Sequence, residues 1–197
     1  MSKAKLDGEN RVREYLTGAN LRIERFSKAE MSLPEKKTPD FRVFSNSELA
    51  FYCEVKTAQE DEWLDRQLAT AADDELVGGL RSDPICSRIN SQIHRAGRQF
   101  NAVNPALDYP NVLAIVNGDR HAGFRDLVNV LGDDPMFHQY SQGRIREEKL
   151  RVHLYLWFDE WKPGDPEPFF PKVHAVHHAT LCRYFNLARA AFHPLRR

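Results

Sequence analysis

Little in this sequence points to a membrane, to a disulfide framework or to a general affinity for polyanions. The three cysteines, Cys53, Cys86 and Cys182, show no CxxC spacing, which disfavours both disulfide staples and a cysteine-rich zinc site. Lys and Arg (28) balance Asp and Glu (28), so binding to nucleic acid would need a local basic patch. No apolar run is long enough to cross a bilayer and the first twenty residues are rich in charge. We therefore expect no signal peptide, no membrane helix and a cytoplasmic protein.

The sequence also lacks internal repeats and low-complexity segments, and its composition is that of an ordinary globular protein. Hydrophobic residues make up 42% of the chain and charged residues 28%, which argues against extended disorder. A chain of 197 residues is suited to one domain with a sizeable core. We expect a single domain over residues 1–197.

Hydrophobic periodicity predicts an alternation of helices and strands. Apolar positions at helical spacing predict helices over about residues 7–19, 85–103 and 180–192. Strand patterns cover residues 21–27, 40–45, 49–57, 112–116 and 151–159, with an edge strand over 173–179. Residues 59–76 form an acidic helical excursion, most simply a solvated face. The order of elements predicts an α/β layered domain around a mixed sheet.

The predicted hairpin over residues 38–57 contains the charged residues Asp40, Glu54 and Lys56, although its other residues are typical of a buried core. The residues Asn46-Ser47-Glu48 have the length of a short hairpin loop, so Ser45 is expected to face Leu49. Counting back along both strands places Asp40 opposite Glu54, with Cβ atoms about 5 Å apart. A slip of one residue at the turn would separate the two carboxylates.

Two neighbouring carboxylates repel each other, and a divalent cation between them removes the repulsion. Ligands that are all oxygen suit Mg²⁺ or Mn²⁺. Lys56 lies two residues beyond Glu54 and therefore on the same face of the strand. Its ammonium group could orient a metal-bound water or stabilise charge that builds on a phosphate.

A stripe of polar and basic residues runs beside the apolar stripe of the 85–103 helix. It consists of Arg88, Gln92, Arg95 and Gln99, with Arg98 close by. The helix contains no acidic residue, so it supplies the local basic patch that the overall charge balance hides. The stripe is either a solvated helix edge or a set of phosphate contacts.

The pair Pro39-Asp40, followed by Glu54-Val55-Lys56, resembles the PD-(D/E)xK signature of the restriction-endonuclease-like nucleases. Ala96-Gly97-Arg98-Gln99 is similar to the A-x-x-Q element of the helix that follows in this family. Glu9, with Val12 and Leu16 behind it, resembles the first-helix glutamate that often completes the site, ahead of Glu14.

The resemblance implies a three-layer core with a central mixed sheet flanked by helices over about residues 7–118. An acidic insertion at about 59–84 interrupts that core, and residues 120–197 form an extension without a counterpart. The implied metal ligands are Asp40, Glu54 and the carbonyl of Val55, with Lys56 as base or charge stabiliser and Glu9 and Gln99 in support. The position of Arg88, Gln92 and Arg95 beside this site favours phosphate contacts over a solvated helix edge. The implied activity is Mg²⁺- or Mn²⁺-dependent endonucleolytic hydrolysis of phosphodiesters, in DNA rather than RNA.

Several alternatives stay open from the sequence. The three hairpin charges could be a surface ion-pair cluster, and the chain could be an inactive binding or assembly protein that keeps the nuclease fold. The acidic insertion could cover the basic helix as an autoinhibitory lid. Pairing of two subunits to cut both strands is open as well. His174, His177 and His178 lack the partner spacing of a zinc site.

Overall fold

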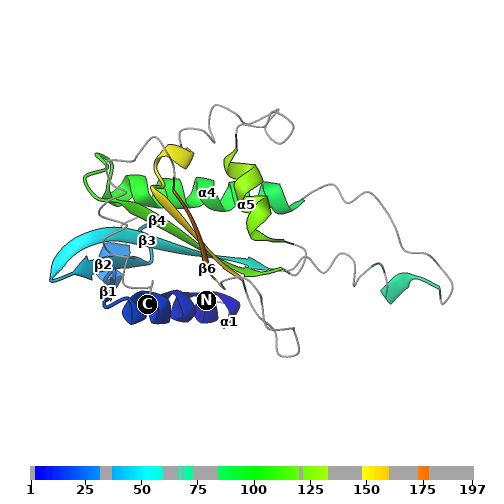
Figure 1. Ribbon diagram of the computed structural model, residues 1–197, viewed down its shortest axis with the longest axis horizontal. Coiled ribbons are helices and arrows are strands. Elements are labelled where there is room, and N and C mark those ends of the chain that lie inside the picture. The colour runs from blue at the N-terminus through cyan, green and yellow to red at the C-terminus, as the bar shows by residue number, and fades with distance from the viewer. Residues whose placement is uncertain are drawn as a thin grey trace.

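The computed structural model of the chain describes residues 3–31, 37–59, 67, 69–72, 84–119, 122–132, 148–159 and 173–177. The helices are α1 (Lys3–Gly18), α2 (Lys28–Met31), α4 (Pro84–Val103) and α5 (Phe124–Leu131). The strands are β1 (Arg22–Arg25), β2 (Phe41–Ser45), β3 (Glu48–Gln59), β4 (Asn111–Gly118), β5 (Leu154–Asp159) and β6 (Val173–His177). The strands form one six-stranded mixed sheet in the order β1-β2-β3-β4-β5-β6, with helices packed on its faces (Figure 1). The predicted α/β class with a central mixed sheet flanked by helices is confirmed.

The sheet combines an antiparallel half with a parallel half. Strands β1, β2 and β3 form an antiparallel meander, whereas β4 runs parallel to β3 and β5 parallel to β4. A parallel pair needs a crossover connection, and α4 lies within the connection from β3 to β4. Strand β6 closes the described sheet, antiparallel to β5, as the predicted edge strand. Residues beyond 120 thus add strands to the same sheet.

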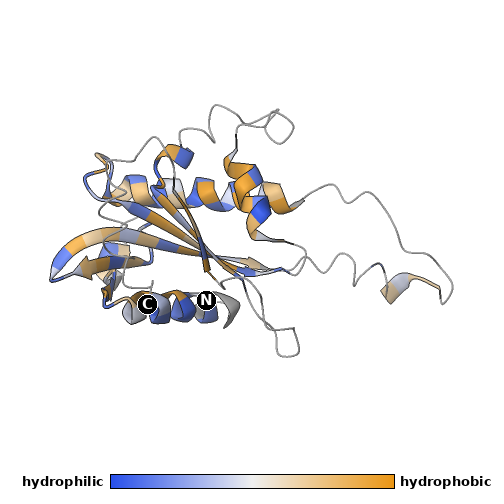
Figure 2. Ribbon diagram, in the orientation of Figure 1, coloured by the Kyte–Doolittle hydropathy of each residue, from blue (hydrophilic) through white to orange (hydrophobic). Residues whose placement is uncertain are grey.

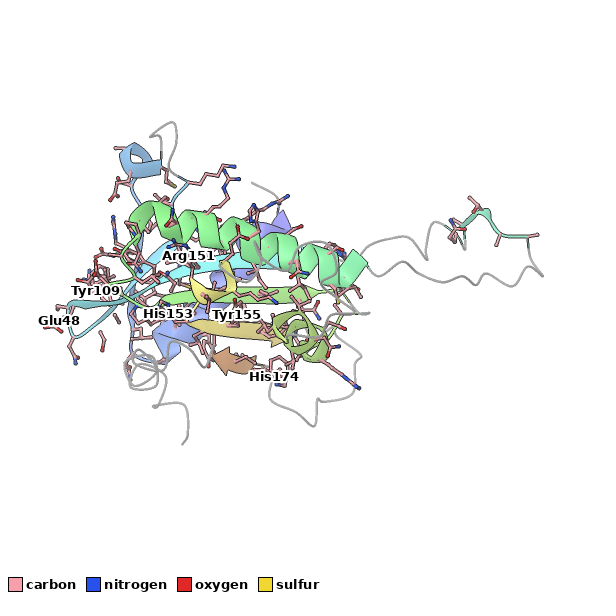
Figure 3. All side chains as sticks on the ribbon, turned by 90° about the horizontal axis from the view of Figure 1, so that it is seen from above. Glu48, Tyr109, Arg151, His153, Tyr155 and His174 are labelled. Carbon is pink, nitrogen blue, oxygen red and sulfur yellow. The ribbon has the colours of Figure 1, made fainter. Side chains whose placement is uncertain are left out.

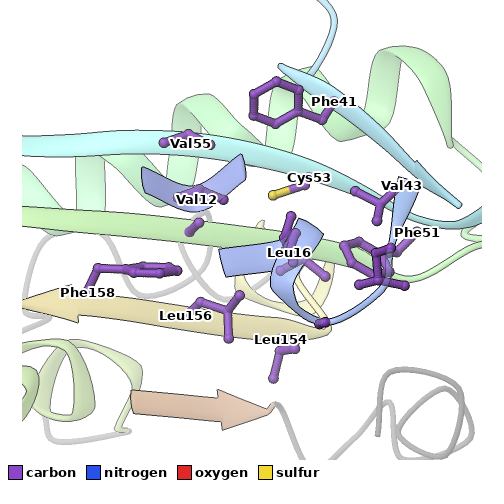
Figure 4. Close-up of a cluster of buried hydrophobic side chains, with 14 of the residues drawn as sticks. Val12, Leu16, Phe41, Val43, Phe51, Cys53, Val55, Leu154, Leu156 and Phe158 are labelled. Atoms are coloured by element: carbon purple, nitrogen blue, oxygen red, sulfur yellow. The ribbon is translucent and has the colours of Figure 1, made fainter. Parts of the chain in front are cut away.

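Helix α1 covers one face of the sheet, because its apolar positions follow the helical period. Val12 and Leu16 of α1 are buried against Cys53 and Val55 of β3 and against Phe158 of β5 (Figure 4). Apart from the buried Glu9, polar residues such as Asn10 and Glu14 are exposed, so α1 mixes hydrophobic and hydrophilic positions (Figure 2). The predicted first helix is confirmed, although it begins at Lys3 rather than near residue 7.

Helices α4 and α5 cover the opposite face (Figure 1). The apolar stripe of α4 is buried as predicted: Ile85, Ile89, Ile93, Ala96 and Phe100 all belong to this second core. Tyr155 and Trp157 of β5 meet it from the sheet. Strand β4 lies between the two cores and is buried along Asn111–Asn117, which agrees with the prediction of a strand covered on both faces.

The predicted three-residue loop of the hairpin is wrong. Asn46 and Ser47 alone form the turn, with φ angles of 49° and 73°, as a tight two-residue hairpin connection requires. Ser45 consequently pairs with Glu48 and not with Leu49.

A bulge further along the hairpin cancels this shift. The register changes between Val43 and Phe44, so that Phe44 pairs with Leu49 while Val43 pairs with Phe51. Ala50 is therefore the extra residue on β3. Beyond the bulge Phe41 pairs with Cys53, and the next position outward brings Asp40 to Glu54 as predicted.

Several predicted features lie outside the described residues. They are most of the acidic excursion at 59–84, the closing helix over 180–192, and the side chains of His177, His178 and Cys182. In the ranges that the structure covers, no helix is long and apolar enough to cross a membrane.

Candidate active site

Asp40 and Glu54 are held together through each other's neighbouring backbone. The backbone N–H of Asp40 donates to Glu54 Oε2 at 3.1 Å. In return, Asp40 Oδ2 accepts a hydrogen bond from the backbone N–H of Val55 at 2.8 Å. Hydrogen bonds to carboxylates are stronger than those between neutral groups. The two carboxylates that the sequence predicted as partners are thus fixed side by side.

The local sequence explains why the hydrogen-bond ladder between β2 and β3 ends beside Glu54, which leaves a gap in the ladder at Val55. The last pair of β2 with β3 is Phe41 and Cys53, and Pro39 carries no N–H that could extend the ladder. Strand β3 continues to Gln59, paired with β4 on its other side. The Val55 N–H, which would bond a backbone carbonyl if β2 continued, donates to the Asp40 carboxylate instead. Because the N–H and C=O of one strand residue point to the same side, the Val55 carbonyl also faces this gap.

Lys56 and Gln99 connect the carboxylates to helix α4. The Lys56 ammonium forms an ion pair with Glu54 Oε1 and donates to Gln99 Oε1 at 2.9 Å. Gln99 Nε2 donates to the Thr38 carbonyl at 2.9 Å, two residues before Asp40. Ala96 is fully buried and lets α4 approach the sheet, so that Gln99, three residues later, reaches β3. Sequence reasoning missed the Thr38 carbonyl because a main-chain acceptor leaves no signal in the sequence.

The electrostatics of this site are those of a buried carboxylate paired with the Lys56 ammonium. The Glu54 side chain is 0% exposed and that of Lys56 is 18% exposed. A buried carboxylate is costly unless it is paired and hydrogen-bonded, and Glu54 has both kinds of partner. Burial raises the pKa of the neighbouring Cys53 thiol well above its ordinary value, and the charges of Asp40 and Glu54 raise that pKa further.

The donor set suits a magnesium or manganese ion. Two carboxylates and one main-chain carbonyl are hard oxygen ligands, and Mg²⁺ is commonly bound by one or two carboxylates while it keeps several waters. Among the described residues, no group of three or more His, Cys, Asp and Glu side chains is placed to hold a metal.

Glu9, the supporting glutamate implied by the resemblance, is a buried residue of the first helix. It lies in α1, which covers the face of the sheet opposite to α4, and its carboxylate forms an ion pair with Arg25 of β1. The Glu9 side chain is 2% exposed, whereas Glu14, the less favoured alternative, is exposed. Glu9 is thus the buried acid of the first helix, in contact with an arginine.

Two of the three predicted phosphate-binding residues make contacts inside the protein. Arg88 Nη2 pairs with the buried carboxylate of Asp119 at 2.6 Å, and Gln92 Nε2 donates to the Thr57 carbonyl at 3.3 Å. Arg95 is exposed. These contacts favour a structural role for Arg88 and Gln92 and leave Arg95 available to solvent.

The histidine of β6 belongs to another part of the molecule. His174 stacks on Phe124 with ring centroids 4.5 Å apart, and its Nε2 lies 3.5 Å from Asp159 Oδ2. Figure 3 shows His174 at β6, on the far side of β4 and β5 from the hairpin. These contacts account for His174 as a packing residue at the edge of the sheet.

Comparisons with models of known families, with curated proteins and with solved structures give no match for this chain.

Proposed function

We propose that this chain is a metal-dependent nuclease with a restriction-endonuclease-like core that hydrolyses phosphodiester bonds, as a DNA endonuclease. The observation that carries the proposal is the junction of Asp40, Glu54, Lys56 and Gln99, which come from a strand hairpin and a distant helix. The order of α1, an antiparallel meander, α4 and a parallel fourth strand supports it, since the resemblance implies this order.

Asp40, Glu54 and the carbonyl of Val55 would hold the metal ion. When bound, such an ion lowers the pKa of a water ligand and polarises a phosphoryl oxygen. The chain contributes preorganisation: the Val55 N–H fixes the Asp40 carboxylate, and the Asp40 N–H fixes that of Glu54. Groups held in place in advance need little rearrangement during the reaction.

Lys56 would act on the substrate phosphate or on the attacking water. Its ammonium group is held between Glu54 and Gln99 and keeps a partly exposed edge, as a group that meets a substrate must. Two carboxylates and one ammonium carry a formal charge of minus one. A divalent cation turns this into plus one, which complements a single phosphodiester group.

The first test is a cleavage assay on linear, supercoiled, branched and single-stranded DNA, with Mg²⁺ or Mn²⁺ against a chelator. The variants are Asp40→Asn and Lys56→Met. The amide introduced by Asp40→Asn keeps an acceptor for the Val55 N–H, so the fold is retained while one ligand charge is lost. We expect metal-dependent cutting by the wild type and a loss of at least about a hundredfold in each variant.

An equal background in wild type and variants would contradict the proposal. Mn²⁺ binding separates the reasons for such a result. If Asp40→Asn loses the Mn²⁺ binding of the wild type, the metal site stands although cleavage was not seen. If both proteins bind Mn²⁺ equally, the alternative of an inactive binding or assembly protein is favoured. RNA of matched length tests the choice of DNA.

A further inference from the structure

Two arginines cover the buried ring of Phe41 at the start of β2. The guanidinium carbon of Arg13 lies 5.5 Å from the ring centroid and that of Arg25 lies 5.6 Å from it. Arg13 belongs to α1, and Arg25 of β1 is the cross-strand partner of Phe41. The ring is 0% exposed. Two like charges thus converge on one aromatic side chain, which attracts cations through its face.

The carboxylate of Glu9 fixes one of these guanidinium groups. Glu9 is buried with its side chain 2% exposed, while the Arg25 side chain is 45% exposed. A guanidinium group carries five N–H donors in a planar fork that matches phosphate oxygens. Arg25 is therefore held from the inside and presents its outer edge to solvent. Two guanidinium groups and one carboxylate leave a formal charge of plus one on this cluster.

The cluster adjoins the candidate active site on the α1 side of the sheet. Phe41 follows Asp40 directly in the chain, and its ring lies in the same buried cluster as Val55 (Figure 4). The N–H of Val55 in turn binds the Asp40 carboxylate. Glu54 and Lys56 point to the α4 face of the sheet and Phe41 points to the α1 face, so the arginine cluster and the carboxylates flank the start of β2 from its two faces. A nucleic-acid strand that passes this edge of the sheet would meet both.

We propose that Arg13 and Arg25 bind a backbone phosphate next to the one that is cleaved, and that Glu9 positions Arg25 rather than serving the metal site. The inference rests on the proposed nuclease function. It gives the buried glutamate of α1 a role that its contact supports, because an isolated buried carboxylate would be costly and its partner is an arginine.

Arg22 provides a matched control on the same strand. It stacks on Phe44 at 4.3 Å and pairs with the exposed carboxylate of Glu24, so it shares the chemistry of Arg25. Its partner Phe44 lies three residues further from Asp40 along β2. Arg22→Gln removes the same charge as Arg25→Gln at a position away from the site.

The experiment measures binding of a short DNA duplex in chelator, where metal-dependent cleavage does not occur, over a series of salt concentrations. Removing one arginine that binds a phosphate lowers the slope of log K against log salt by about one. We expect this smaller slope, and a several-fold weaker affinity, for Arg25→Gln and Arg13→Gln, and an unchanged slope for Arg22→Gln. Equal slopes for Arg25→Gln and Arg22→Gln would overturn the inference.

Glu9→Gln tests the positioning role separately. If Glu9 positions Arg25, the variant binds DNA more weakly and retains wild-type affinity for Mn²⁺. Loss of Mn²⁺ affinity with unchanged DNA binding would overturn this role. The two proposals fail in different ways: wild-type protein that binds DNA with the expected slopes but never cuts it supports the arginine pair and overturns the nuclease.

Discussion

At the scale of single residues, two of the ion pairs in the described part of the chain can be compared directly. Glu54 pairs with Lys56, and Asp119 pairs with Arg88; both carboxylates are 0% exposed and both cations are partly exposed. The difference lies in the surroundings, since the Asp40 carboxylate accepts from the backbone N–H of Val55, the residue next to Glu54. Under the proposed function, the comparison of the two pairs isolates what the second carboxylate adds to the first.

Replacing Lys56 by Met should make the stability of the protein depend on metal. Removing one partner of a buried pair costs about 3–5 kcal/mol, because the buried Glu54 carboxylate loses its ion pair with the Lys56 ammonium. A divalent cation that binds only the folded state restores stability in proportion to its concentration. We expect a lower melting temperature for Lys56→Met and a larger upward shift with Mn²⁺ than in wild type, measured by thermal unfolding.

Arg88→Met is the control for that measurement. It leaves Asp119 buried without its cation, so the melting temperature should fall by a similar amount. Mn²⁺ should not restore it through that site. Equal restoration of both variants, or of neither, would contradict a metal site at Asp40 and Glu54.

At the scale of elements, the close approach of α1 to the sheet depends on Gly8. A Cβ atom at this position would lie 2.8 Å from Thr57 Oγ1 and 3.6 Å from the Cβ of Val116. Glycine inside a helix is unfavourable by roughly 0.5–1 kcal/mol relative to alanine. Its presence here is explained by the contact with β3 and β4, which brings Glu9 to its buried position.

Gly8→Ala should therefore destabilise the protein although alanine is the better helix former. Overpacking costs typically about 1–3 kcal/mol, and the added Cβ would force the Thr57 side chain to move. Gly18→Ala is the control, since no described atom lies within 4 Å of a Cβ built there. Urea unfolding should give a lower free energy of unfolding for Gly8→Ala and an equal or higher one for Gly18→Ala. Stabilisation by both substitutions would show that α1 can move away from the sheet.

The elements also show what could be predicted from the sequence. The helical period of α4 predicted both its buried stripe and the position of Gln99, and the alternation of β3 predicted that Glu54 and Lys56 share a face. The two-residue turn and the bulge at Ala50 were missed, because both depend on local backbone geometry that hydrophobic patterning does not encode.

Contacts between distant elements were beyond sequence reasoning. The partners of Glu9, Arg88 and Gln92 became visible only with the fold. Each partner comes from a segment that only the packing of helices against the sheet brings near.

At the scale of the whole molecule, one sheet separates two buried cores that share its central strands. Cys53 belongs to the core under α1, and Tyr155 belongs to the core under α4 and α5. Burial raises the pKa of the Cys53 thiol and of the Tyr155 hydroxyl above their ordinary values. Each group therefore reports on the exposure of its own core when the protein unfolds.

These pKa shifts predict a loss of stability in alkaline solution. The folded protein keeps both protons at pH values where the unfolded chain releases them. These two groups therefore leave the free energy of unfolding unchanged below about pH 9 and lower it above that pH. Cys53 alone lowers it by roughly 1 kcal/mol per pH unit, and Tyr155 adds a further decrease above about pH 10. Urea unfolding from pH 7 to 11 should show that the free energy of unfolding decreases less between pH 9 and 10 in Cys53→Ala than in the wild type. Tyr155→Phe should retain that first decrease and weaken the second. Since the two groups lie on opposite faces of the sheet, an effect of only one substitution would show that the other core opens before the molecule unfolds.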